Sequence, residues 1–189
     1  ALRQAQAHFQ QQTQPAGSSK VILGSCTSEE SVVLPPVGQA LRLAARSLIL
    51  PSPNPRVGCV LTAPDGAVIG TGHTQQAGGP HAEIMALRDA QARGASTQGA
   101  TAWVTLEPCS HHGRTGPCCD ALIAAGISKV VASTADPNPL VSGQGFARLR
   151  AAGIEVEVGP GAAASRDLHL GFFSRRVRGP PWGRMKLAA

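Results

Sequence analysis

Two short segments hold the residues whose types and spacing could do chemistry. One contains His81 and, two residues later, Glu83, and the other has a cysteine near each end, Cys109 and Cys118. An imidazole and two thiolates are ligands that Zn²⁺ prefers in proteins, and three protein ligands leave the fourth position of a tetrahedral site open. An open position is typical of a catalytic zinc rather than a structural one. The sequence therefore predicts a zinc site held by His81, Cys109 and Cys118.

Glu83 is expected to lie beside this metal without binding it. A carboxylate there can take a proton from water and pass it to a ring nitrogen. A histidine, a glutamate two residues on, then Pro-Cys and a second cysteine is the arrangement of zinc-dependent base deaminases. Cys119 is the rival ligand, but its side chain leaves a helix start about 100° further round than that of Cys118. A helix beginning at Cys118 would also stabilise that thiolate.

The apolar pattern supplies the elements that must position these residues. Expected helices lie at 41–48, 81–92, 118–125, 144–152 and 162–175, and expected strands at 57–63, 67–71, 101–106, 129–133 and 154–158. A Pro-Asp-Gly turn at 64–66 joins the first two strands in a hairpin. A hairpin followed by repeated strand and helix predicts an α/β fold, with a mixed sheet covered on both faces. Both chemical segments fall where the chain enters a helix, and therefore at one edge of the sheet.

Composition and charge narrow the class of protein. The chain has 189 residues, 42% of them apolar and 15% charged, which is typical of one globular domain with an appendage. With no Tyr, four Phe and two Trp, it has few rings for stacking on nucleic acid bases. Of its net charge of +6, six basic residues and one acid lie between 166 and 189, so the body is nearly neutral. A small substrate with one anionic group fits better than a nucleic acid.

The cysteines and the lengths of the apolar segments indicate where in the cell the protein is found. Five cysteines, three of them crowded into 109–119, indicate metal binding or catalysis rather than a disulfide framework. No segment approaches the ~18 apolar residues of a membrane-spanning helix. Residues 1–15 are Gln-rich and do not resemble a secretory leader. We therefore expect a cytoplasmic protein that does not bind membranes, with Cys59 as a small buried apolar residue in a strand.

Five motifs follow one another in a fixed order. They are SPNPRVGCV (52–60), GH (72–73), AGGPHAE (77–83), VTLEPCSHHGRTGPC (104–118) and DPNP (136–139). On these motifs, residues 37–176 resemble the deaminase half of the bifunctional riboflavin-biosynthesis deaminase/reductase family. Eight residues separate Cys109 from Cys118, where cytidine and tRNA-adenosine deaminases usually have two, and this long loop is the feature most particular to the riboflavin enzymes. Gly116 stands where that family usually has proline, a change that removes no ligand.

The resemblance implies a three-layer cytidine-deaminase-like fold and a reaction. It divides the chain into a poorly patterned extension (1–35), a zinc-dependent deaminase domain (36–176) and the start of a linker and first reductase strand (177–189). We expect no reductase activity from this chain. With zinc as cofactor, water would replace the amino group at ring carbon 2 of a diamino-hydroxy-pyrimidine carrying a phosphoribosylamino group, giving a uracil derivative and ammonia.

The resemblance also assigns residues to roles. His81, Cys109 and Cys118 match the zinc ligands and Glu83 the proton shuttle. The positions that match the pyrimidine and phosphoribosyl pocket are Asn54, His73, His111, Arg114, Asp136 and Asn138. Among them, an imidazole at 111 and a guanidinium at 114 suit contacts to the phosphate.

Two other functions stay open at this point. A nucleic-acid base deaminase of the tRNA type would share the metal chemistry, but the neutral body and the long loop weigh against it. A non-catalytic, zinc-stabilised binding module would need four protein ligands and no free carboxylate such as Glu83. Glu107 could pass for a second catalytic carboxylate, yet we expect it to hold its loop by hydrogen bonds. The sequence leaves open whether the protein is a monomer or a homo-oligomer.

Overall fold

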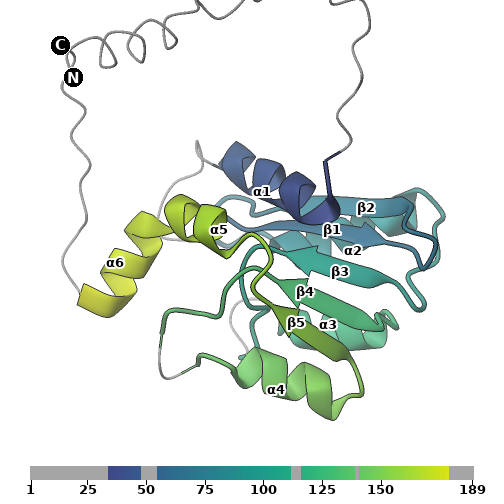
Figure 1. Ribbon diagram of the computed structural model, residues 1–189. Coiled ribbons are helices and arrows are strands. Elements are labelled where there is room, and N and C mark those ends of the chain that lie inside the picture. The colour runs from purple at the N-terminus through teal and green to yellow at the C-terminus, as the bar shows by residue number, and fades with distance from the viewer. Residues whose placement is uncertain (1–33, 48–54, 112–115, 139–140, 179–189) are drawn as a thin grey trace, which may run out of the picture. The chain divides into compact units, whose positions relative to one another are not determined.

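The computed structural model describes residues 34–47, 55–111, 116–138 and 141–178, which fall in the second of two compact units, Val33–Ala189 (Figure 1). The predicted extension at 1–35 and the predicted linker at 177–189 lie almost wholly outside the described residues. Two of the predicted pocket residues, Asn54 and Arg114, also lie outside the described residues.

A five-stranded mixed sheet forms the centre of the fold. Its strands are β1 (Gly58–Thr62), β2 (Val68–His73), β3 (Thr101–Val104), β4 (Lys129–Ala132) and β5 (Glu155–Val158), in the order β2-β1-β3-β4-β5. β1 is antiparallel to β2 and β3, whereas β3, β4 and β5 are parallel. Cys59 pairs with Val104, so the start of β1 lies beside the ends of β2 and β3, and the end of β4 lies beside that of β3 at the same edge. One edge of the sheet thus gathers the loops in which chemistry was expected.

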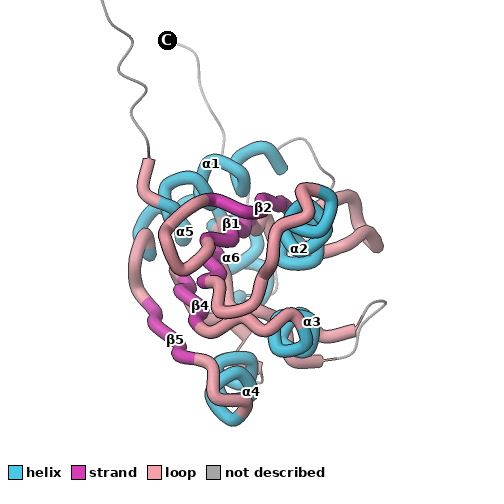
Figure 2. The backbone as a smooth tube through the Cα atoms, turned by 90° about the vertical axis from the view of Figure 1, so that its right-hand side faces the viewer, coloured by secondary structure: helices cyan, strands magenta, loops and turns pink. Residues whose placement is uncertain are grey.

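Helices cover both faces of this sheet. They are α1 (Pro36–Arg46), α2 (Ala82–Ala92), α3 (Cys118–Ala124), α4 (Gln144–Ala151), α5 (Ala162–Leu168) and α6 (Leu170–Arg178). α1 and α5 lie on one face, and α2, α3 and α4 lie on the other (Figures 1 and 2). The predicted α/β arrangement is confirmed in its three layers. None of the described helices combines the length and apolar character needed to cross a membrane.

Two glycines of β2 let α2 approach the sheet closely. A Cβ at Gly70 would lie 2.3 Å from the carbonyl oxygen of Ala86, and a Cβ at Gly72 would lie 2.2 Å from that of Ala82. Any larger residue would push the helix away from the strand. This close packing brings the first turn of α2, with the residues around His81, to the edge where the strands end.

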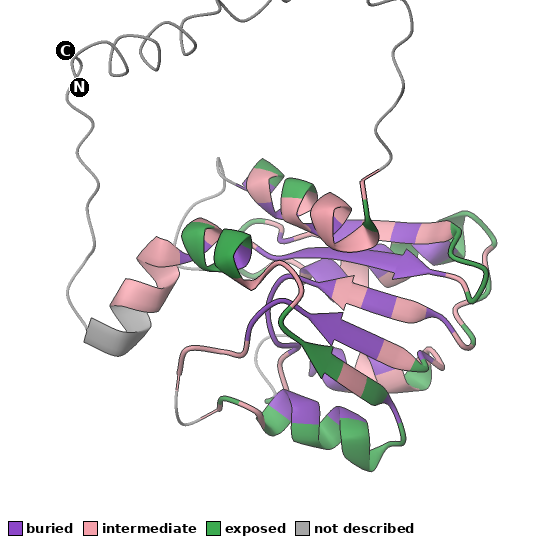
Figure 3. Cartoon of the chain, viewed as in Figure 1, coloured by how far each residue is buried: buried purple, intermediate pink, exposed green. Residues whose placement is uncertain are grey.

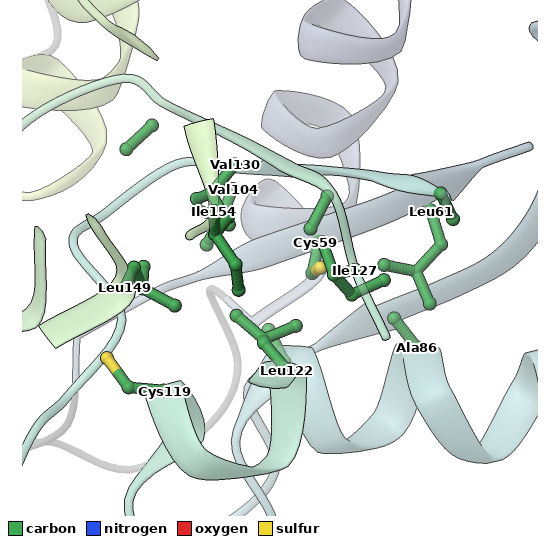
Figure 4. Close-up of a cluster of buried hydrophobic side chains, with 14 of the residues drawn as sticks. Cys59, Leu61, Ala86, Val104, Cys119, Leu122, Ile127, Val130, Leu149 and Ile154 are labelled. Atoms are coloured by element: carbon green, nitrogen blue, oxygen red, sulfur yellow. The ribbon is translucent and has the colours of Figure 1, made fainter. Parts of the chain in front are cut away.

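The core lies between the sheet and the helices (Figure 3). All five residues of β1 are buried, because this strand has neighbours on both sides and helices on both faces. A cluster of apolar side chains, including Leu61, Leu122 and Leu149, fills the space between the sheet and the helices α2, α3 and α4 (Figure 4). Cys59 is fully buried in this cluster, as expected for a small apolar residue.

The predicted elements match the observed ones to within two residues at their ends, with two exceptions. Helix α1 begins at Pro36, five residues before the predicted start at 41. The single helix expected at 162–175 is wrong, because the chain turns at His169 and forms α5 and α6. The His169 side chain is 1% exposed, and its Nδ1 lies 2.7 Å from the carbonyl oxygen of Ser165. Burying this ring against the preceding turn redirects the chain, which the apolar spacing alone did not indicate.

Candidate metal centre and active site

Three side chains that could bind a metal converge at the edge of the sheet where β1 begins and β3 ends. His81 is the residue before α2, Cys109 lies in the loop after β3, and Cys118 is the first residue of α3. The Nδ1 atom of His81 lies 3.2 Å from the Cys118 sulfur and 3.6 Å from the Cys109 sulfur. A tetrahedral zinc with bonds of about 2.0 to 2.3 Å separates its ligand atoms by roughly 3.5 Å. Within the described residues, this is the one cluster of three such groups.

The protonation of the two thiols supports a cation at this place. A hydrogen bond from the Cys118 thiol lowers the pKa of Cys109 to about 4, and the same hydrogen bond, together with burial, raises the pKa of Cys118. The Cys118 backbone N–H, at the start of α3, also donates to the Cys109 sulfur at 3.3 Å. The pair thus shares one proton between two sulfurs. Zn²⁺ replaces such protons when it binds thiolates, so the donor set fits this metal.

Cys119 is turned away from this cluster. Its thiol donates to the carbonyl oxygens of Pro108 at 3.3 Å and Gly145 at 3.5 Å. It is buried beside Leu122 and Leu149 (Figure 4), and burial raises its pKa to about 12. The helix start directs Cys118 and not Cys119 toward His81.

Glu83 lies in the first turn of α2 and is 3% exposed. Burial raises the pKa of its carboxyl to about 7, against the opposing effects of its backbone hydrogen bond and of the nearby His81. A carboxyl group with a pKa near neutrality can both accept and donate a proton. The two-residue separation from His81 therefore places a buried carboxyl group beside the cluster.

A cavity of about 190 Å³ opens above these groups. An engineered cavity of about 150 Å³ admits benzene, so this space can hold a single six-membered ring. Its lining combines polar residues, among them Glu83, Cys109 and Asp136, with apolar ones such as Leu106 and Phe172. A flat heterocycle has polar edges and apolar faces and suits such a cavity.

The structure places the expected pocket residues unevenly. His111 and Asp136 line the cavity. His73, at the end of β2, and Asn138 are absent from its described lining. Asn138 is tied to it indirectly, since its backbone N–H donates to Asp136 Oδ1 at 2.8 Å.

Other lining residues had no distinguishing signal in the sequence. Thr74 follows β2, and its Oγ1 accepts a hydrogen bond from the backbone N–H of Val57 at 2.9 Å. Phe172 comes from α6, near the C-terminal end of the described chain. Neither residue belongs to a motif, and only the folded chain brings them to the site.

Glu107 holds its surroundings by hydrogen bonds, as predicted. Its Oε2 accepts the backbone N–H groups of Asp136 at 3.0 Å and Gly143 at 2.9 Å, and its Oε1 accepts that of Gly145 at 2.9 Å. This carboxylate joins the loop that carries Cys109 to the segment that carries Asp136.

Known proteins place the chain among zinc-dependent deaminases. The family described as the cytidine and deoxycytidylate deaminase zinc-binding region matches residues 37–134. The riboflavin biosynthesis protein RibD of Escherichia coli is 53% identical over 153 residues, which make up 81% of this chain and 41% of that protein. The diaminohydroxyphosphoribosylamino-pyrimidine deaminase of Buchnera aphidicola (subsp. Schizaphis graminum) is 44% identical over 76% of this chain and 95% of that protein. This chain belongs to the riboflavin-biosynthesis branch of the deaminase family.

Solved structures agree with this assignment of the chain to the riboflavin-type deaminases. The Thermotoga maritima diaminohydroxyphosphoribosylaminopyrimidine deaminase/5-amino-6-(5-phosphoribosylamino)uracil reductase is 42% identical, with a TM-score of 0.73 over 78% of this chain and 42% of that one. Acinetobacter baumannii RibD is 49% identical, with a TM-score of 0.72 over 78% of this chain and 40% of that one. The chain thus spans about two fifths of these relatives. The cytidine-deaminase-like fold expected from the motifs is confirmed, and the zinc-binding region contains His81, Cys109 and Cys118.

Proposed function

We propose that this chain deaminates 2,5-diamino-6-(5-phosphoribosylamino)pyrimidin-4-one, giving 5-amino-6-(5-phosphoribosylamino)uracil and ammonia. The observation that carries the proposal is the meeting of His81, Cys109 and Cys118 with the buried Glu83 at a ring-sized cavity. The Buchnera relative, whose length this chain covers almost entirely, is named for such a deaminase.

The residues divide the work of this hydrolysis. His81, Cys109 and Cys118 would hold the zinc, which when bound lowers the pKa of a water molecule to near ~7. Glu83 takes one proton from the attacking water and delivers it to the ring nitrogen. It then takes the second proton from the hydroxyl group that has formed on carbon 2 and passes it to the departing amino group. The bond between carbon 2 and its amino nitrogen breaks, a carbon–oxygen bond replaces it, and ammonia leaves. A carboxyl pKa of about 7 suits both directions of transfer.

Recognition of the substrate falls to the surrounding loops. We assign His111 and Arg114 to the phosphate, because cationic and hydrogen-bonding side chains bind this group well. The pyrimidine and ribosyl part is assigned to the remaining predicted residues, Asn54, His73, Asp136 and Asn138. The position of His111 and Asp136 at the cavity supports their part of this assignment.

The same proposal includes the bounds of the domain, its binding partner and its cellular compartment. We place the deaminase domain at 36–176 and take its partner to be the small pyrimidine phosphate rather than a nucleic acid. The free thiols of Cys59, Cys109, Cys118 and Cys119 suit a reducing compartment such as the cytoplasm.

Ammonia release tests this function directly. Zinc-loaded protein is incubated with the diamino-pyrimidine phosphate, and in parallel with deoxycytidylate and with tRNA, each with and without a chelator. We expect ammonia from the pyrimidine phosphate alone, and its loss with the chelator. Release from tRNA with none from the pyrimidine phosphate would instead favour a nucleic-acid deaminase.

A further inference from the structure

The lining of the cavity includes one phenyl ring. Among the described lining residues, Phe172 is the only phenylalanine, and Val57 and Leu106 are further apolar members of that lining. It belongs to α6, whereas the match to the shared zinc-binding region ends at residue 134. The ring therefore comes from a part of the chain outside the shared zinc-binding region.

The turn between α5 and α6 fixes where this ring lies. The Ser165 hydroxyl donates to the carbonyl oxygen of Thr105, just after β3, and the Ser165 carbonyl oxygen contacts His169 Nδ1 at 2.7 Å. The His169 ring meets Phe172 edge-on, with centroids 6.4 Å apart and planes at 64°. The sheet edge, α5 and the start of α6 are thus joined by buried contacts. Through these contacts the turn places Phe172 at the cavity.

A phenyl ring in this position matches one part of the substrate. The polar lining residues Glu83 and Asp136 suit groups at the edge of a heterocycle. The faces of the same heterocycle are apolar and stack well on aromatic side chains. We propose that Phe172 contacts the pyrimidine ring and is a specificity-determining residue. This inference rests on the proposed deaminase function and identifies the wall of the cavity that selects a flat ring.

Substitution of Phe172 by leucine tests the contact. Loss of one base–aromatic contact corresponds to roughly a tenfold to hundredfold loss of affinity. We expect Phe172→Leu to raise KM for ammonia release by about that factor, with a smaller effect on kcat and an unchanged zinc content. Phe172→Tyr keeps the ring and should keep KM within about threefold. Phe172→Met is a second ring-free variant, should the leucine variant fold poorly.

Phe173 offers a matched control in the same helix. It is the same residue type, also packs against the core, and stacks on His169 with centroids 5.6 Å apart, but it is not among the described residues of the cavity lining. Phe173→Leu should lower the melting temperature about as much as Phe172→Leu while leaving KM near that of the wild type. An equal rise in KM for both variants would overturn the assignment of Phe172.

Different results would contradict the deaminase function and the role of Phe172. Wild-type protein that releases no ammonia contradicts the deaminase function. Wild-type protein that is active, with KM unchanged in both Phe172→Leu and Phe172→Met, contradicts the role of Phe172 alone. Calorimetric binding of the uracil product to the same variants gives a second reading, in which Kd should rise by the same tenfold to hundredfold as KM.

Discussion

Two adjacent residues of one type, Cys118 and Cys119, have opposite surroundings. Cys118 shares a proton with Cys109 beside His81, whereas Cys119 donates to two carbonyl oxygens in the core. The rotation of about 100° per residue in a helix is sufficient for this difference. At the scale of the residue, direction rather than chemical type decides which thiol can bind a metal.

Replacing each cysteine by serine tests this distinction. We expect Cys118→Ser to lose nearly all bound zinc, because a hydroxyl is a poor substitute for a thiolate ligand. Cys119→Ser should keep one zinc per chain and lose only stability, since its group is buried among carbonyl oxygens and apolar side chains. Metal analysis of the purified variants measures both. Equal zinc loss in the two variants would contradict the geometry of the cluster.

Glu83→Gln separates proton transfer from metal binding. Glutamine has the same shape as glutamate and cannot carry the proton, so ammonia release should fall by about 100- to 10,000-fold. Zinc content and melting temperature should stay close to those of the wild type, because Glu83 is not one of the clustered ligand residues. Turnover near the wild-type rate would exclude Glu83 as the proton carrier.

At the scale of elements, the loops that meet at one edge of the sheet hold each other in position. Glu107 follows β3 and accepts three backbone N–H groups from the segment that leads into α4. At Gly145 a Cβ would lie 2.1 Å from the carbonyl oxygen of Pro108, so this segment also packs tightly on the metal-binding loop. The position of Asp136 is therefore set by the loop that carries Cys109.

Glu107→Gln should weaken the hydrogen bonds that join these two segments and so lower the stability of the fold. One oxygen becomes an NH₂ group, so one buried N–H, such as that of Gly145, loses its acceptor. Such a loss costs about 1–3 kcal/mol in the free energy of unfolding. Glu155→Gln is the control, because this side chain is 69% exposed and pairs with Lys129 at the surface, where a pair contributes under about 1 kcal/mol. Urea denaturation compares the two variants, and equal effects would argue against a structural role for Glu107.

The turn between α5 and α6 makes stability depend on pH. Burial lowers the pKa of His169, hydrogen bonds to the backbone of Ser165 and Arg56 oppose this, and the charge of Arg56 adds to the lowering. The folded protein keeps the ring neutral where the unfolded chain already binds a proton. The stability contributed by a neutral His169 is therefore complete above its usual pKa of about 6.5 and falls as the pH decreases below it, by at most about 1.4 kcal/mol per pH unit.

Comparison with His169→Gln isolates this effect. The difference in the free energy of unfolding between wild type and variant should shrink from about pH 7.5 to about pH 5.5, since only the wild type loses this contribution. Denaturation curves at several pH values give the difference. A gap that stays constant or widens toward acid would contradict a neutral, buried His169.

The sequence predicted more of the elements than of their contacts. Period-two and helical spacing located the hairpin, the parallel strands and four of the six described helices, because each pattern reflects burial on one face. The break at His169 was missed, since it depends on a ring buried against its own helix. At the site, the motif spacing predicted His81, Glu83, Cys109 and Cys118. Phe172 could not be predicted, because an apolar residue of a helix has the same pattern whether it faces core or cavity.

For the whole molecule, the cluster links parts of the chain that are far apart in sequence. His81 is 28 residues from Cys109 and 37 residues from Cys118; it precedes α2, whereas Cys109 follows β3 and Cys118 begins α3. An unfolded chain holds no such preformed site, so the free energy of zinc binding adds to that of folding. The zinc-binding region should therefore stabilise the fold as well as support the reaction.

Removal of zinc should lower the melting temperature of the full chain. At a zinc concentration of about 1,000 times Kd, binding stabilises the folded state by about 4 kcal/mol. For a chain of this size, that corresponds to roughly 10 °C, and zinc added back should restore it. Cys118→Ser should melt at the same temperature with and without a chelator, because it lacks one of the three ligands. A wild-type melting temperature that ignores the chelator would contradict zinc binding by residues from separate elements, since a metal on their common edge must hold them together.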